Sequence, residues 1–116
     1  VMVKEDYLGT NADTVQRFCN ALAGAMRLIR EDKAAYVAAM TAEFPNLDKA
    51  VVASGCDRLL GTRGFVPLNP IVTKAEWDAI VEHDTLAGTV RKAFTFEELV
   101  DNRFAEKATD GFGRRS

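Results

Sequence analysis

Apolar residues recur at helical spacing through most of this chain. Between Asn11 and Arg30 they fall three and four positions apart, at Val15, Phe18, Cys19, Leu22, Met26 and Ile29. That spacing predicts an amphipathic helix, with Asn11 as its N-cap and Asp13 in its first turn. The middle of this helix is made of small residues that let another backbone approach closely, namely Ala21, Ala23, Gly24 and Ala25.

Two shorter helices are predicted next. One begins at Asp32, a suitable N-cap, and ends before Pro45, which cannot continue a helix. The other begins near Asp48 and reaches Leu60, where the glycine-containing residues 61–64 interrupt the pattern. Because that segment lacks a phosphate-binding motif and follows no strand, it is interpreted as a turn.

Two more helices begin with the same capping device. Thr73 is followed by Glu76, and Thr95 by Glu98, which is the spacing of a capping box. Gly88 is expected to end the first of these helices. The second is predicted to continue through Phe104.

Three segments lack the helical pattern. Residues 1–8 are typical of a β-strand, and residues 65–72 form an extended connection that is apolar enough to lie against the protein. Residues 109–116 are expected to be a flexible tail. The pattern therefore predicts a mainly α segment over residues 1–108, with about five helices and one short N-terminal strand.

Length and composition limit the possible classes of protein. A chain of 116 residues is large enough for one domain, and its apolar content of 47% and charged content of 28% are ordinary for a globular protein. A net charge of -2 gives no basic surface for nucleic acid, so no nucleic-acid partner is expected. No apolar run approaches the roughly 20 residues that cross a bilayer.

The residues that could carry chemistry are better explained as structural. Cys19 and Cys56 are interpreted as small buried apolar residues, and a bond between them stays open. His83 is the one histidine of the sequence, so a four-ligand metal site cannot be assembled, and it is expected on the surface. The carboxylates of Glu97, Glu98 and Asp101 are assigned to capping and to a solvated helix face. No catalytic residue, metal or cofactor is therefore expected.

Five stretches, taken in order, resemble the C-terminal part of the substrate-binding proteins of ABC importers. The particular group is the nitrate, sulfonate, taurine and thiamine-precursor family. Residues 1–8 resemble its strand returning to the first lobe, 11–25 its long helix, 31–35 its step into an alanine-rich helix, 73–77 its penultimate helix and 95–104 its closing stretch. That family usually has Asn-Pro where Asn11 and Ala12 stand here. The match is poorest over residues 54–64.

The resemblance implies an α/β parent protein with the two-lobed type II periplasmic binding fold. Such a receptor closes on a small molecule between its lobes and presents it to a membrane permease. It implies a periplasmic or other extracytoplasmic location, with a lipid anchor in the full protein, and no enzymatic activity. Most ligand contacts in this family come from the other parts of the receptor. Tyr7 and Asn11, just after the returning strand, are the candidates if any residue here reaches the ligand.

The partners implied are the missing N-terminal lobe of the same protein, the ABC permease and, in the full protein, a small-molecule ligand. This ligand would be a sulfonate, nitrate, taurine or a thiamine precursor. The apolar stripe of the first helix would normally cover a sheet, so its exposure predicts a dimer or higher assembly.

Two alternatives stay open. One is a stand-alone helical interaction module that binds a partner helix in a groove. The other is an enzyme, because relatives of this fold synthesise the thiamine pyrimidine. An enzyme would need a catalytic histidine and a cofactor lysine elsewhere in the protein, and His83 alone does not support it.

Overall fold

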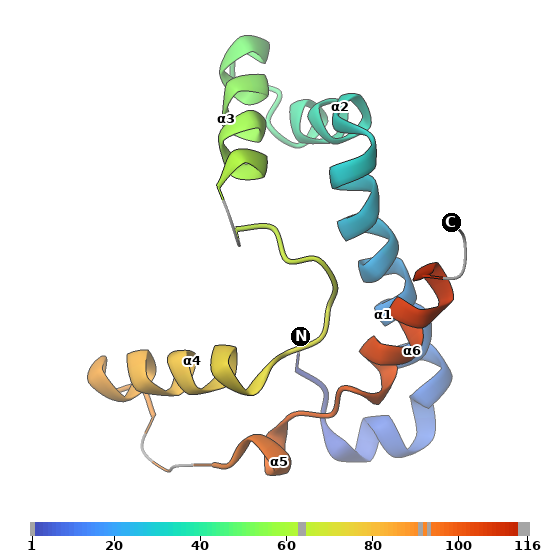
Figure 1. Cartoon of the computed structure of the whole chain (residues 1–116), viewed down its shortest axis with the longest axis vertical. Coiled ribbons are helices and arrows are strands. Elements are labelled where there is room, and N and C mark those ends of the chain that lie inside the picture. Colours follow the sequence, from blue (N-terminus) through green and yellow to red (C-terminus); the bar gives the residue numbers. More distant parts are fainter. Residues whose placement is uncertain (1, 63–64, 91, 93, 114–116) are drawn as a thin grey trace.

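Helices make up the regular structure of the chain (Figure 1). The computed structural model describes residues 2–62, 65–90, 92 and 94–113. Within these residues it contains helices and no strand, and the mainly α prediction is confirmed. The helices are α1 (Glu5–Glu31), α2 (Lys33–Glu43), α3 (Lys49–Gly61), α4 (Lys74–Leu86), α5 (Phe96–Leu99) and α6 (Arg103–Gly113).

The predicted N-terminal strand is wrong for the residues that can be described. Met2 to Lys4 have no regular structure, and α1 begins at Glu5. Glu5 and Asp6 lie in the first turn, where the helix dipole favours negative charge. A strand also needs a neighbour to satisfy its backbone groups, and none lies within the described segments. Val1 lies outside the described residues.

Asn11 lies at a bend inside α1, where two helical stretches meet, so the predicted helix does follow Asn11 but is preceded by another helical stretch. Its backbone has a φ of -129° and a ψ of 30°, which are not helical values, and the helix bends there. Its side-chain amide donates to the Tyr7 carbonyl oxygen at 3.1 Å and to the Thr10 hydroxyl oxygen at 2.8 Å. The amide thus points back along the chain, and the prediction that Asn11 caps the helix is wrong.

The other predicted helix starts are confirmed. The carboxylate of Asp32 accepts a hydrogen bond from the Ala35 backbone N–H at 2.9 Å, and that of Asp48 accepts one from Ala50 at 2.8 Å. These bonds satisfy backbone donors that have no partner within the helix.

Both predicted capping boxes are also present. At the start of α4, the Thr73 hydroxyl accepts from the Glu76 backbone N–H at 3.3 Å, and the Glu76 carboxylate accepts from the Thr73 N–H at 2.8 Å. Thr95 and Glu98 form the same box before α5. Gly88 follows the end of α4 with a φ of 71°, a conformation that favours glycine, as expected for a terminator.

The last predicted helix is divided in two. α5 ends at Leu99, and α6 begins at Arg103, where the Asp101 carboxylate accepts from the Arg103 backbone N–H at 3.1 Å. α6 then runs to Gly113, so helix extends into the segment that was expected to be a tail. Residues 114–116 lie outside the described part.

The connection over residues 65–72 lies partly against the protein. Val66, Ile71 and Val72 are half-buried, whereas Phe65 and Leu68 are exposed. The Arg30 guanidinium, near the end of α1, donates to the carbonyl oxygens of Pro67 and Leu68.

Packing is extensive only between some of the helices. α6 packs along α1, and α2 packs against both α1 and α3. The buried side chains are small or medium in size, namely Ala23, Val52, Cys56, Ala105 and Ala108. The predicted close approach of a second helix to the small residues of α1 therefore agrees with the burial of Ala23.

The molecule is open for its length. Its radius of gyration is 16.9 Å, whereas a compact domain of this length has about 13 Å. Its accessible surface is 9214 Å², whereas a compact protein of 12.7 kDa exposes about 6,200 Å². Much apolar surface that a compact fold would cover is therefore in contact with solvent.

Candidate functional site

The two residues proposed from the sequence as ligand contacts lie together on α1. Tyr7 is one helical turn before Asn11, and its backbone carbonyl accepts the bond from the Asn11 amide. The Tyr7 residue is 46% exposed, and Asn11 is half-buried. The bend therefore brings an exposed phenol and a side-chain amide to one place, and their role in ligand binding stays a prediction.

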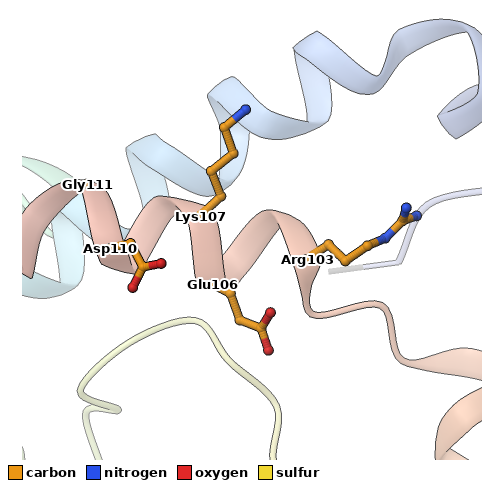
Figure 2. Close-up of a pocket in the computed structure, with 5 residues that line it drawn as sticks. All are labelled: Arg103, Glu106, Lys107, Asp110 and Gly111. Atoms are coloured by element: carbon orange, nitrogen blue, oxygen red, sulfur yellow. The ribbon is translucent and has the colours of Figure 1, made fainter.

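Shallow hollows follow α6 and α3, and each is lined by residues of one helix. The first follows α6 and is lined by Arg103, Glu106, Lys107, Asp110 and Gly111. Figure 2 shows Lys107 pointing away from Glu106 and Asp110, so these charges do not converge on one point. A small-molecule site normally has walls from several elements that bury most of the ligand. This hollow lacks such walls.

The second hollow follows α3 in the same way. It is lined by Ala50, Val51, Ser54, Gly55 and Arg58. Its floor is made of small side chains, and a Cβ added at Gly55 would meet no atom within 4 Å. It is therefore an open helix face rather than a cleft.

Two of the clustered carboxylates, Glu98 and Asp101, have a lowered pKa. Hydrogen bonds from the Thr95 backbone and hydroxyl lower the pKa of Glu98. A hydrogen bond from the Arg103 side chain lowers the pKa of Asp101, and the two groups are 2.7 Å apart. A general acid near neutral pH needs a raised carboxyl pKa, so both shifts have the wrong direction.

His83 lies on the surface, as predicted. Its side chain is 82% exposed, and its Nδ1 atom is 3.2 Å from Asp84 Oδ1. The exposed imidazole thus turns toward the carboxylate of the adjacent residue. An exposed pair on one helix has no enclosed space in which to hold a substrate.

Both thiols are free. Cys19 is half-buried on α1, and this burial raises its pKa, which disfavours the reactive thiolate. Cys56 is buried on α3. Beside it, burial and the neighbouring thiol together raise the pKa of Tyr36. These are the properties of structural cysteines, which is the interpretation made from the sequence.

Two further kinds of feature are absent from the described residues. No three His, Cys, Asp or Glu side chains there gather closely enough to hold a metal ion. No helix in the same ranges is long and apolar enough to cross a membrane.

A contact missed by the sequence analysis joins two distant segments. Asn102, between α5 and α6, accepts a hydrogen bond from the Val72 backbone N–H at 3.0 Å. Its amide donates to the Val72 carbonyl oxygen at 2.8 Å. One side chain thus pairs both backbone groups of a residue 30 positions earlier, as a neighbouring strand would. No local pattern indicates this pair, which we call the neck.

Comparison with known proteins gives one distant similarity. Over 109 residues the chain is 27% identical to a protein of Bacillus subtilis (strain 168) named "Putative binding protein YtlA". The aligned part is 93% of this chain and 32% of the relative, so the chain spans about a third of the length of that relative. No family model and no solved structure matches the chain. That relative is named a binding protein, which is the broad class of the family that the chain resembles.

Proposed function

We propose that this chain is the C-terminal segment of a solute-binding receptor that delivers a small molecule to an ABC importer. The observation that carries the proposal is the similarity to a larger binding protein along nearly the whole chain. The order of the helices that resemble this receptor family supports it independently of that relative. The segment acts as a scaffold and is not an enzyme.

The packing of the chain is consistent with such a part. The buried residues are few, and large apolar side chains such as Phe18, Leu28 and Ile80 are about half exposed. Apolar surface of this extent normally marks an interface. In the proposed receptor the N-terminal lobe of the same protein covers part of it, and the ligand is held outside this segment.

The finer proposals follow from the family resemblance. The ligand is a sulfonate, nitrate, taurine or a thiamine precursor, and the receptor works outside the cytoplasm beside its permease. Tyr7 and Asn11 are the residues of this segment that would approach the ligand. They lie at the bend of α1, where a side chain can turn away from the helix bundle.

A stand-alone helical interaction module is the second candidate. The same exposed apolar side chains favour it, because an amphipathic partner helix could cover them. The two candidates differ in what precedes Val1 in the gene. A receptor needs a long upstream reading frame with a leader, and a module does not.

The first test is to read the gene upstream of Val1 and to produce the full reading frame. The purified protein is then heated with and without taurine, sulfonates, nitrate and thiamine precursors. A ligand present at 100 times its Kd stabilises the folded state by about 2.7 kcal/mol, which raises the melting temperature measurably. The 116-residue chain serves as the control and should not respond. A start codon adjacent to Val1 would overturn the proposal.

A further inference from the structure

The bend in α1 is made at a single residue. Asn11 alone has non-helical backbone angles within Glu5–Glu31, so residues 5–10 and 12–31 are two helical stretches that meet there. Figure 1 shows the first stretch lying at an angle to the rest of α1. The Asn11 φ of -129° is negative and does not require glycine, and the helix contains no proline. The cause of the bend must therefore be sought in the side chains.

The side chains of Thr10 and Asn11 bond to carbonyl oxygens at the end of the first stretch. The Asn11 amide nitrogen donates to the Tyr7 carbonyl oxygen at 3.1 Å. The Thr10 hydroxyl lies 3.4 Å from the carbonyl oxygens of both Asp6 and Tyr7. In an unbroken helix the Tyr7 carbonyl pairs with the backbone N–H of Asn11, four positions later. A side chain that inserts at such a carbonyl is a known cause of helix kinks.

The amide of Asn11 uses its donors within the chain. Its NH2 group has two hydrogens, and it donates to the Tyr7 carbonyl oxygen and, at 2.8 Å, to the Thr10 hydroxyl oxygen. Asn11 is also half-buried, whereas Tyr7 is 46% exposed. Of the two candidates, Tyr7 is therefore better placed to meet a small molecule, and Asn11 is better placed to direct Tyr7.

Residues 5–10 have little else to set their direction. Leu8 is half-buried, and the other residues of this stretch are exposed. A helical stretch of six residues is not stable in water by itself. Its angle, and with it the direction of the Tyr7 ring, therefore depends on the joint with the rest of α1. The bonded groups of that joint lie within residues 6–11, so the bend does not depend on what covers the rest of the chain.

A straight α1 would carry Tyr7 to a different place. Tyr7 and Phe18 are 11 positions apart in the sequence, which is about three turns, so an unbroken helix would align them on one face. Phe18 belongs to the apolar stripe of α1, the helix that packs along α6. The bend takes the phenol off the line of that stripe.

We propose that Asn11 is a positioning residue, whose side-chain amide holds α1 bent and so sets the direction of Tyr7. That Tyr7 then meets a ligand rests on the proposed receptor function, whereas the bend does not. Replacing Asn11 by alanine returns the Tyr7 carbonyl to the backbone and puts a better helix former at the joint. The helix should then run unbroken from the first stretch into the second.

The test is nuclear magnetic resonance of the isotope-labelled 116-residue chain. In the parent chain the Cα chemical shift of Asn11 should be non-helical, and residual dipolar couplings should give residues 5–10 and 12–31 different axes. Asn11→Ala should give a helical Cα shift at this position and one common axis. Asp13→Ala is the matched control, because it also introduces alanine into α1, at an exposed position, and it should leave the two axes as they are.

A second variant separates the effect of the amide from that of helix propensity. Valine has about the same helix propensity as asparagine, but its side chain has no hydrogen-bond donor. Asn11→Val should therefore also align the two stretches. A parent chain with one common axis, or an Asn11→Val variant that stays bent, would overturn the proposal. A full-length protein that binds no small molecule would overturn the receptor function instead, without changing the axes measured in this chain.

Discussion

Replacing Asn102 by alanine should remove the paired hydrogen bonds to Val72 while leaving every helix in place. The side chain makes two hydrogen bonds, at 3.0 Å from the Val72 N–H and at 2.8 Å to the Val72 carbonyl oxygen. Asn102 directly precedes α6, and the two hydrogen bonds of its side chain both go to Val72. The substitution therefore tests the neck by itself.

The expected cost follows from these two bonds. Each ordinary hydrogen bond contributes about 0.5–1.5 kcal/mol net, and a polar group left unpaired in a buried place costs more. Val72 and Asn102 are both half-buried, so water can replace part of what is lost. Asn102→Ala should therefore lower the free energy of unfolding by about 1–3 kcal/mol.

Urea unfolding followed by circular dichroism at 222 nm measures this difference. Asn46→Ala is the control, because Asn46 is exposed in the turn between α2 and α3 and its change should stay within about 0.5 kcal/mol. If Asn102→Ala were no more destabilising than this control, the neck would not stabilise the fold and the reasoning would fail.

Asn102→Asp gives the same test a pH signature. The introduced carboxylate still accepts from the Val72 N–H, but it faces the Val72 carbonyl oxygen without a proton to donate. Its pKa in the folded state should therefore lie above the usual value of about 3.9. A raised pKa means that stability is present at low pH and is lost as the pH rises through the folded-state value. Relative to wild type, the variant should recover in acid, and a constant difference would contradict the assignment.

Three further predictions concern single positions. Glu76→Gln should lower the free energy of unfolding near neutral pH but not in acid. Hydrogen bonds from Thr73 lower the pKa of Glu76, so the stability that these bonds supply is lost as the pH falls through that lowered pKa. Unfolding curves from pH 3 to 7 would refute this if the difference in stability between wild type and variant did not shrink in acid. Gly88→Ala should lower stability by about 1 kcal/mol, because Gly88 has a φ of 71°. Gly55→Ala, inside α3 with open space for the added Cβ, should raise stability by up to about 1 kcal/mol. Thermal melts that rank the two variants in the opposite order would contradict this prediction. Ala108→Leu should cost about 1–3 kcal/mol by overfilling the buried surface of α6, and a urea midpoint equal to wild type would show that this face is not tightly packed.

The sequence predicted best those features that depend on neighbouring residues. The caps at Asp32 and Asp48 and the boxes at Thr73 and Thr95 each join groups no more than three residues apart. Their bonds form wherever the helix begins, whatever the rest of the chain does. The four helix starts were therefore predictable from short motifs.

Features that depend on distant residues were missed. The break between α5 and α6 is held by Asn102, whose partner Val72 is 30 residues away. The continuation of α6 to Gly113 accompanies its packing on α1 through Ala105 and Ala108, and alanines give little hydrophobic signal. A strand at residues 1–8 would need a neighbouring strand that the described chain does not contain. For the candidate site, the sequence placed Tyr7 and Asn11 near each other, but it gave no sign of the bend that joins them.

The same shortage of distant contacts sets a limit on the stability of the chain by itself. Helices of the length of α2, α3 and α4, which have 11 to 13 residues, are marginal in water unless an apolar face is packed. Here the buried residues are mainly alanines, whereas many of the leucine and phenylalanine side chains are exposed. Covering those side chains should therefore be coupled to helix formation, whichever partner covers them. The 116-residue chain by itself is expected to self-associate through these side chains, so its helix content at 222 nm should rise between about 1 and 100 μM and then reach a plateau. Helix content that is full and constant over this range, with a monomeric mass, would show that the helices are stable without any partner.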